Sequence, residues 1–243
     1  MRGRAVDWEQ PVVVAVVDSG IDAGHAWFAG APLVVRDFTG EGLGDVSGHG
    51  TFHAGQVWHL AAGRCRLLVA RVVAADDVAR PEAVVEALAW ARDEGAEVVS
   101  IGLGAEVAPP RLHAAVREVA ARAAVVAPVG NVLCYEPGPA ALYPARYEEV
   151  LGAGTRARDG RPGTAGCAGL DVRAEGEAEG PWTGGSREVR LGTSVAAARV
   201  AGRVAGLLSL EPWLREAVRA GRARQVLLAR LGSDGGLHHE GVP

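Results

Sequence analysis

Residues 11–22 read Pro-Val-Val-Val-Ala-Val-Val-Asp-Ser-Gly-Ile-Asp, and this stretch decides the expected fold. The run from Pro11 to Val17 is rich in β-branched residues and shows no alternation of apolar and polar positions. A strand of that composition is buried on both faces, which is typical of a parallel sheet covered by helices. The run ends in Asp18 and a Ser-Gly turn, so an acid is expected at the carboxyl end of this first strand.

Short apolar runs alternate with longer helical patterns along the rest of the chain. Further strands are expected over residues 66–73, 96–103, 124–128 and 150–154. Helices are expected over 49–60, 81–94, 110–123 and 194–210, with one or two more between 212 and 231, and the Gly- and Glu-rich segment 176–188 is expected to be a surface loop. This order predicts a three-layer, doubly wound α/β fold, with a mostly parallel sheet and helices on both faces. Residues 1–243 are expected to form a single domain.

The charge balance and the hydropathy exclude several classes of protein. Twenty-five basic residues against 29 acidic ones give a net charge of −4 without long runs of either sign, so no nucleic-acid partner is expected. No apolar stretch reaches the roughly 18 residues of a membrane span, and the N-terminus lacks the apolar core of a signal peptide. The cysteines, Cys65, Cys134 and Cys167, are widely spaced, which favours reduced thiols and a cytoplasmic protein.

Three segments carry residues suited to acyl-transfer chemistry. Asp18 ends the first strand, His49 begins an expected helix, and Ser194 begins another. A hydroxyl nucleophile needs an imidazole to take its proton and a carboxylate to orient that imidazole. Each of these residues alone could equally be a turn or helix-cap residue. Because strand carboxyl ends and helix N-termini converge in an α/β fold, the three can form one site.

The surrounding motifs resemble those of the subtilisin-like serine proteases (subtilases), in that family's order of Asp, His and Ser. The similarity runs from about residue 12 to about residue 212 and includes six ordered segments. These are Asp-Ser-Gly-Ile-Asp at 18–22, Gly-His-Gly-Thr-Phe-His-Ala-Gly at 48–55, Val-Val-Ala-Pro-Val-Gly-Asn at 125–131, Tyr-Pro-Ala at 143–145 followed by Val-Leu-Gly-Ala-Gly at 150–154, Asp-Val-Arg-Ala at 171–174, and Gly-Thr-Ser-Val-Ala-Ala-Ala-Arg-Val-Ala-Gly at 192–202. The resemblance implies a subtilisin-like fold and a serine protease domain. Because only about ten residues precede the first expected strand, no propeptide is expected.

The resemblance also implies a role for each matching residue. Ser194 would be the nucleophile, His49 the general base and then the general acid, and Asp18 the carboxylate that orients the imidazole. The Asn131 amide and the Ser194 backbone N–H would form the oxyanion hole. The substrate-binding positions would be Gly102, Leu103 and Gly104, then Pro128, Val129 and Gly130, and finally Leu142.

Several residues depart from the family pattern. Ala198 replaces a proline four residues after the serine, and Phe52 stands where the family has a second histidine, with His53 following. Gly102 stands where the family usually has serine. Leu142 stands where many members have a small residue, so it would shorten the primary specificity pocket.

No metal ion and no cofactor are expected. His49 and His53 lie four residues apart on one expected helix, but the glutamate of a zinc-binding His-Glu-x-x-His motif is missing. The short turn at 61–65 stands where the family has its strongest calcium site, and it contains no carboxylate or amide ligand.

Shorter segments resemble the subtilases that mature cyanobactin-type ribosomal peptides by trimming a leader or follower from a precursor. They are residues 25–32, 63–68 and 139–144, together with Cys134 shortly after Asn131. This resemblance implies a peptide or precursor-peptide substrate. Cys134 itself is either a residue near the active site or an ordinary small packing residue. The alternatives are a general intracellular protease, a catalytically silent subtilase-fold scaffold that binds peptides, and a domain of a longer secreted protease.

The sequence also predicts how the enzyme becomes active and whether its peptide product is linear or cyclic. The chain begins close to the first strand, so we expect an enzyme that is active without proteolytic activation. Asp18 and His49 are 31 positions apart with a Gly-rich segment between them, which favours hydrolysis over ring closure because no helical lid would exclude water. Tyr143–Pro144 is expected to be a cis peptide, as in the family's Tyr-Pro segment.

Overall fold

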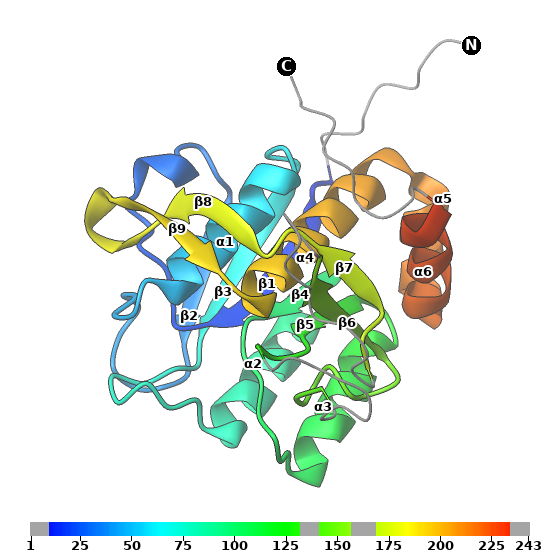
Figure 1. The fold of residues 1–243 in the computed structure, drawn as a ribbon, viewed down its shortest axis with the longest axis horizontal. Coiled ribbons are helices and arrows are strands. Elements are labelled where there is room, and N and C mark those ends of the chain that lie inside the picture. The colour runs from blue at the N-terminus through cyan, green and yellow to red at the C-terminus, as the bar shows by residue number, and fades with distance from the viewer. Residues whose placement is uncertain (1–9, 132–140, 157–168, 234–243) are drawn as a thin grey trace.

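The computed structural model describes residues 10–131, 141–156 and 169–233, and its centre is a seven-stranded sheet (Figure 1). The strand order is β2-β3-β1-β4-β5-β6-β7, and every neighbouring pair is parallel. The strands are β1 (Val12–Asp18), β2 (Leu33–Asp37), β3 (Cys65–Arg71), β4 (Val98–Ile101), β5 (Ala124–Pro128), β6 (Val150–Thr155) and β7 (Val172–Ala174). The expected parallel sheet is confirmed.

Helices cover both faces of this sheet, with α1 and α4 on one face and α2 and α3 on the other (Figure 1). Their bounds are α1 (His49–Leu60), α2 (Pro81–Asp93), α3 (Pro110–Ala120) and α4 (Thr193–Leu210). The C-terminal part of the described chain adds α5 (Pro212–Ala217), the π turn η3 (Val218–Arg222) and α6 (Ala223–Ser233). The three-layer α/β architecture is therefore as predicted.

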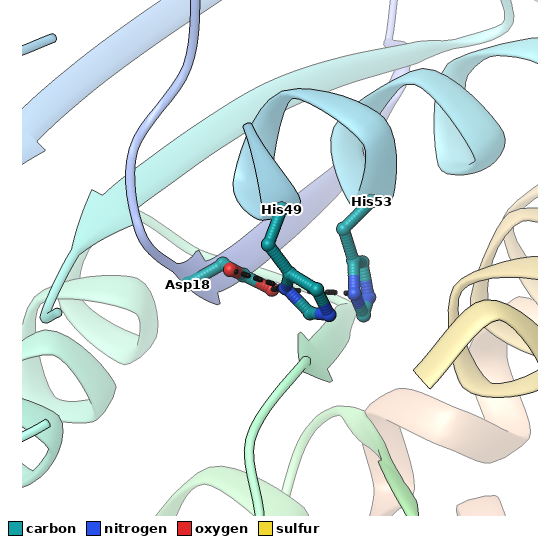
Figure 2. A group of neighbouring side chains, drawn as sticks. All are labelled: Asp18, His49 and His53. Atoms are coloured by element: carbon teal, nitrogen blue, oxygen red, sulfur yellow. Dashed lines mark hydrogen bonds and ion pairs between the residues drawn. The ribbon is translucent and has the colours of Figure 1, made fainter. Parts of the chain in front are cut away.

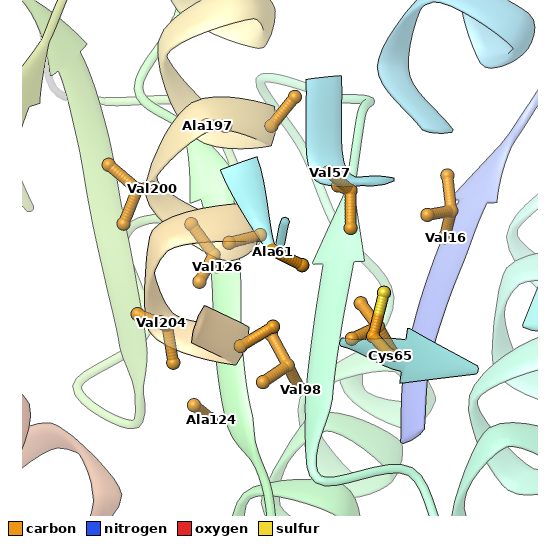
Figure 3. Close-up of a cluster of buried hydrophobic side chains, with 14 of the residues drawn as sticks. Val16, Val57, Ala61, Cys65, Val98, Ala124, Val126, Ala197, Val200 and Val204 are labelled. Atoms are coloured by element: carbon orange, nitrogen blue, oxygen red, sulfur yellow. The ribbon is translucent and has the colours of Figure 1, made fainter. Parts of the chain in front are cut away.

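The first strand shows why the valine-rich run contains no polar alternation. Val12, Val14 and Val16 are fully buried in the cluster that α1 and α4 cover, while Ala15 and Val17 are fully buried in the cluster under α2 and α3. Figure 3 shows Val16 in the first of these clusters. Both faces of the strand are thus removed from water, as the composition indicated.

Small residues allow the two helices of one layer to approach closely. A Cβ atom on Gly202 of α4 would lie 2.8 Å from the backbone oxygen of Val57 and 3.0 Å from its Cα, on α1. Ala61, which directly follows α1, belongs to the same core cluster as Ala197 and Val200 of α4 (Figure 3). This close packing joins the helix that begins at His49 to the helix that carries Ser194.

The segment 176–188, expected to be a surface loop, instead contributes most of a β-hairpin. Strands β8 (Glu177–Pro181) and β9 (Arg187–Leu191) pair antiparallel and are joined through η2 (Thr183–Gly185). The hairpin lies against α1, where the Gln56 side-chain Nε2 donates a hydrogen bond of 2.8 Å to the Glu179 carbonyl. Its sequence did not indicate a strand because most of its side chains are solvent-exposed or half-buried, so it contains no long apolar run.

Two short strands at the edges of the main sheet, β2 and β7, were also not predicted. β7 has three residues and β2 alternates half-buried and exposed positions, so neither produces a long apolar run. The expected cis peptide at Tyr143–Pro144 is confirmed. Within the described residues, no helix combines the length and the apolar character needed to cross a membrane.

Candidate active site

The carboxyl end of the central strand β1 meets the N-terminus of α1. Asp18 is the last residue of β1 and is fully buried, and His49 is the first residue of α1 and is half-buried. The His49 Nδ1 atom lies 2.8 Å from Asp18 Oδ1 and 3.0 Å from Oδ2. Because an ionised carboxylate can only accept, the proton is on Nδ1 and the other ring nitrogen, Nε2, is left as the base.

The hydroxyl of Ser194 lies on the other side of the same imidazole. Ser194 is the second residue of α4, and its Oγ is 3.1 Å from His49 Nε2. Three side chains that are 31 and 145 positions apart therefore form one hydrogen-bonded chain. This geometry allows His49 to take the proton of the Ser194 hydroxyl.

Asp18 and His49 each shift the pKa of the other. Burial by itself would raise the pKa of Asp18, but the charge of His49 and its hydrogen bond, with His53 and the Ser19 backbone N–H, bring it below its ordinary value. The Asp18 carboxylate raises the pKa of His49, against the opposing effect of burial. The site therefore stabilises the ion pair of Asp18 with an imidazolium, which is the charge arrangement of acyl transfer.

A carboxylate that the sequence analysis did not select organises the start of α1. Asp45 Oδ1 accepts hydrogen bonds from Ser19 Oγ (2.8 Å) and from the Gly48 N–H (2.9 Å). Its Oδ2 accepts from both the backbone N–H (2.8 Å) and the hydroxyl (2.6 Å) of Thr51. An acid at a helix N-terminus satisfies its unpaired donors and complements its dipole, so Asp45 holds in place the turn from which His49 projects. The available signal was an acid just before the predicted helix start.

Asn131 lies beside the start of α4 and contacts Thr193, the residue before Ser194. Its Oδ1 accepts hydrogen bonds from the Thr193 N–H (2.8 Å) and the Thr193 hydroxyl (3.1 Å). The oxygen end of the amide is thereby held against α4, which leaves the Nδ2 end as the donor. The Ser194 N–H lies in the first turn of α4, where backbone donors have no partner within the helix.

A cleft of about 650 Å³ begins at the site and runs along the end of β4. Its lining includes the predicted residues Gly102, Leu103 and Gly104, together with Tyr143 and Trp182. A Cβ on Gly104 would lie 2.9 Å from the Cβ of Leu142, so Leu142 packs directly against this wall. An extended peptide can lie in such a cleft and pair with the half-buried and exposed backbone at 103–104 that follows β4.

The predicted residues 128–130 lie beside the site rather than in this cleft. Pro128 and Val129 are buried, and the Gly130 N–H donates to the Thr193 hydroxyl at 3.2 Å. Among the residues that the structure describes, the cleft lining does not include these three or Leu142. Cys134 lies outside the described residues.

The absence of a side chain at Gly102 leaves room for Asp18 and His53. A Cβ there would lie 1.8 Å from Asp18 Oδ2 and 2.8 Å from His53 Nδ1. The departure from the serine of the family is thus explained: in this chain the Asp18 carboxylate and the His53 ring occupy that volume.

The sequence analysis gave His53 no role in catalysis. Figure 2 shows it on the same side of α1 as His49, with both rings beside Asp18. One donor atom from each of these three residues lies within 4.8 Å of the others, and in the described part of the chain they form the one such group of His, Cys, Asp and Glu. Hydrogen bonding to Asp18 already employs His49 Nδ1, and the expectation of no metal stays a prediction.

The chain is similar to known proteins over most of its length. A family model described as "Subtilase family" matches residues 9–241. Subtilisin E of Bacillus subtilis is 29% identical over 224 residues, which cover 86% of this chain and 58% of subtilisin E. The intracellular serine protease of Paenibacillus polymyxa is 28% identical over 169 residues, covering 63% of this chain and 50% of that protein. The chain thus spans between half and three fifths of the length of these two relatives.

A solved structure supports the same assignment of the fold. The prenylagaramide maturation protease PagA superimposes with a TM-score of 0.74 at 26% identity, covering 92% of this chain and 83% of that one.

Proposed function

Since this chain belongs to the subtilase family, we propose that it is a serine endopeptidase that cleaves peptides through an acyl-enzyme on Ser194. The observation that carries this proposal is the imidazole of His49, which lies 2.8 Å from Asp18 Oδ1 and 3.1 Å from Ser194 Oγ. A catalytically silent scaffold would not need this alignment.

In the proposed reaction, His49 Nε2 removes the proton from Ser194 Oγ as that oxygen attacks the peptide carbonyl carbon. Asp18 keeps the imidazole in the Nδ1–H tautomer and stabilises the imidazolium that forms. The Asn131 amide and the Ser194 N–H would donate to the developing oxyanion. His49 then protonates the leaving amine as the C–N bond breaks, and a water activated by His49 releases the acyl group as a carboxylate.

The proposed substrate is a ribosomally made precursor peptide from which a leader or follower segment is trimmed. The similarity to PagA, a prenylagaramide maturation protease, supports this class. The substrate chain would pair with the backbone at 102–104, with residues 128–130 and Leu142 adjoining it. We place the enzyme in the cytoplasm, supported by the intracellular serine protease among its relatives. Fractionation of the source cells tests that location.

A fluorophosphonate probe tests the activity. The probe should label the wild-type chain at Ser194, located by peptide mapping, and heat-denatured protein should not react. Absence of labelling in the folded protein would contradict the protease and favour the peptide-binding scaffold.

The product should be linear. Between Asp18 and His49 the structure holds strand β2 and the three-residue turn η1 (Ala26–Phe28), so no helical lid from this segment shields an acyl-enzyme from water. Mass spectrometry of the fragments cut from a precursor peptide should show free carboxylates. A fragment lighter by one water would reveal a ring and refute this prediction.

Replacing Gly102 by alanine should slow the reaction by about a hundredfold or more. The new methyl group would lie 1.8 Å from Asp18 Oδ2, so the carboxylate has to move, and displacements near 1 Å carry rate losses of about that size. The loss is measured as the ratio of the rate constants for fluorophosphonate labelling of the wild-type chain and the variant. Gly44→Ala is the matched control, because a Cβ there meets nothing within 4 Å. Equal labelling rates for both variants would show that moving the Asp18 carboxylate does not slow the reaction, which would contradict this prediction.

A further inference from the structure

The second histidine of α1 lies against the carboxylate of the proposed triad. His53 follows His49 by four residues, one turn along the same helix face, and its side chain is 1% exposed (Figure 2). Its Nδ1 lies 3.3 Å from Asp18 Oδ2. Its Nε2 lies 2.7 Å from the hydroxyl oxygen of Ser100, a fully buried residue of β4.

The surroundings determine which ring nitrogen of His53 carries the proton. Burial lowers the pKa of His53 to about 4, with Asp18 opposing and His49 adding to this effect, so the ring is neutral at neutral pH. A neutral imidazole has one N–H and one acceptor nitrogen. Two lone pairs facing each other at 3.3 Å would repel, so the proton is on Nδ1 beside the carboxylate. Ser100 then donates its hydroxyl proton to Nε2.

The two oxygens of Asp18 have unequal support. Oδ1 accepts from the Ser19 N–H at 2.7 Å and from His49 Nδ1 at 2.8 Å. Oδ2 has the longer contact with His49, at 3.0 Å, and otherwise faces His53. The volume beside Oδ2 is closed to any side chain at position 102, because a Cβ there would lie 1.8 Å from that oxygen.

Resting on the proposed protease function, we propose that His53 is a positioning residue, which holds the Oδ2 oxygen of Asp18 through its Nδ1–H and is itself oriented by the Ser100 hydroxyl. Its neutral ring supplies a donor without placing a second positive charge beside the imidazolium of His49. The chain Ser100–His53–Asp18–His49–Ser194 thus extends the proposed triad by two residues.

Three substitutions separate this role from simple packing. His53→Leu removes both contacts. His53→Asn places an amide N–H near the position of Nδ1 and can still donate to Asp18, whereas His53→Gln places its amide near Nε2 and keeps only the Ser100 contact. His59→Leu is the control, because His59 is an exposed histidine of the same helix.

The readout is the second-order rate constant for labelling by a fluorophosphonate probe between pH 5 and pH 9. His53→Leu and His53→Gln should react about ten- to a hundredfold more slowly than wild type, the range of a hydrogen bond to a charged group. His53→Asn should recover about tenfold relative to the leucine variant, and His59→Leu should match wild type. Without the Nδ1–H, the charge of Asp18 acts more strongly on His49, so the acid limb of the profile should move to higher pH in the Leu and Gln variants only.

Several results would overturn the inference. Equal slowing of all three His53 variants with an unmoved acid limb would mean that the ring only fills space, and wild-type rates would mean that it does nothing. If His53→Leu fails to fold, the comparison of Asn with Gln decides. Nitrogen-15 NMR of histidine-labelled full chain gives a readout independent of activity: His53 should be the neutral Nδ1–H form, and an Nε2–H form refutes the proposal. An unlabelled wild-type chain would instead refute the protease function.

Discussion

Replacing Ser194 by alanine should lower peptide turnover by about six orders of magnitude, the size of the loss known for the nucleophile of subtilisin. The alanine has no Oγ, so His49 Nε2 loses its partner at 3.1 Å and no acyl-enzyme can form. The oxyanion donors do not depend on the hydroxyl, so a small residual rate above that of water should persist.

The measurement compares kcat/KM on a peptide selected from an internally quenched library by cleavage with wild-type protein. Ser209→Ala is the control, since that serine lies near the other end of α4 and its hydroxyl donates to the Gly206 carbonyl. Cleavage by Ser194→Ala at the wild-type rate would remove Ser194 from the mechanism. If the inactive variant still binds the peptide, the substrate cleft does not need the Ser194 hydroxyl for binding.

Asp18→Asn should lower kcat by about 10⁴, the loss known when the equivalent residue is changed in a trypsin-like protease. The amide is nearly isosteric, but its NH₂ group facing His49 Nδ1 favours the Nε2–H tautomer, which cannot accept the Ser194 proton. Asp76→Asn, at an exposed aspartate whose partner is Arg80, serves as the control.

The same variant should shift the pH profile in a defined direction. Asp18 raises the pKa of His49, and the protonated imidazole is inactive as a base, so wild-type activity falls as the pH drops through that raised pKa. Without the carboxylate the pKa falls, and the residual activity should extend to lower pH. An acid limb that stays in place would show that Asp18 does not set the charge of His49.

The sequence predicted those strands and helices that are marked by a local pattern, such as a continuous apolar run or a glycine turn. The valine run of β1 is buried on both faces because it lies in the middle of the sheet, and such burial leaves a continuous apolar run. The helices α1 and α4 begin at or next to His49 and Ser194, where motifs with glycine mark the turns. Hydrophobic burial and turn chemistry act over a few residues, so they can be read without knowing the partners.

The hairpin β8–β9 could not be predicted in that way. Its strands carry charged and glycine residues, and the contact that seats it on α1 is made between Gln56 and the Glu179 carbonyl, 123 positions apart. A backbone acceptor is the same for every residue type, so composition does not indicate it. The edge strands β2 and β7 were missed for a related reason, because partial exposure or short length weakens the apolar signal.

By itself, the sequence determined the residue types of the site and their order: an acid ending a strand and a histidine and a serine beginning helices. Only the tertiary structure decided which further groups surround them. Asp45 and His53 are ordinary polar residues in the sequence, and their contacts with the site follow from the approach of α1 to β1 and β4. Two side chains come into contact only where their helices, strands or loops pack together. That packing is determined by the sum of many buried contacts across the core, and not by the two side chains themselves.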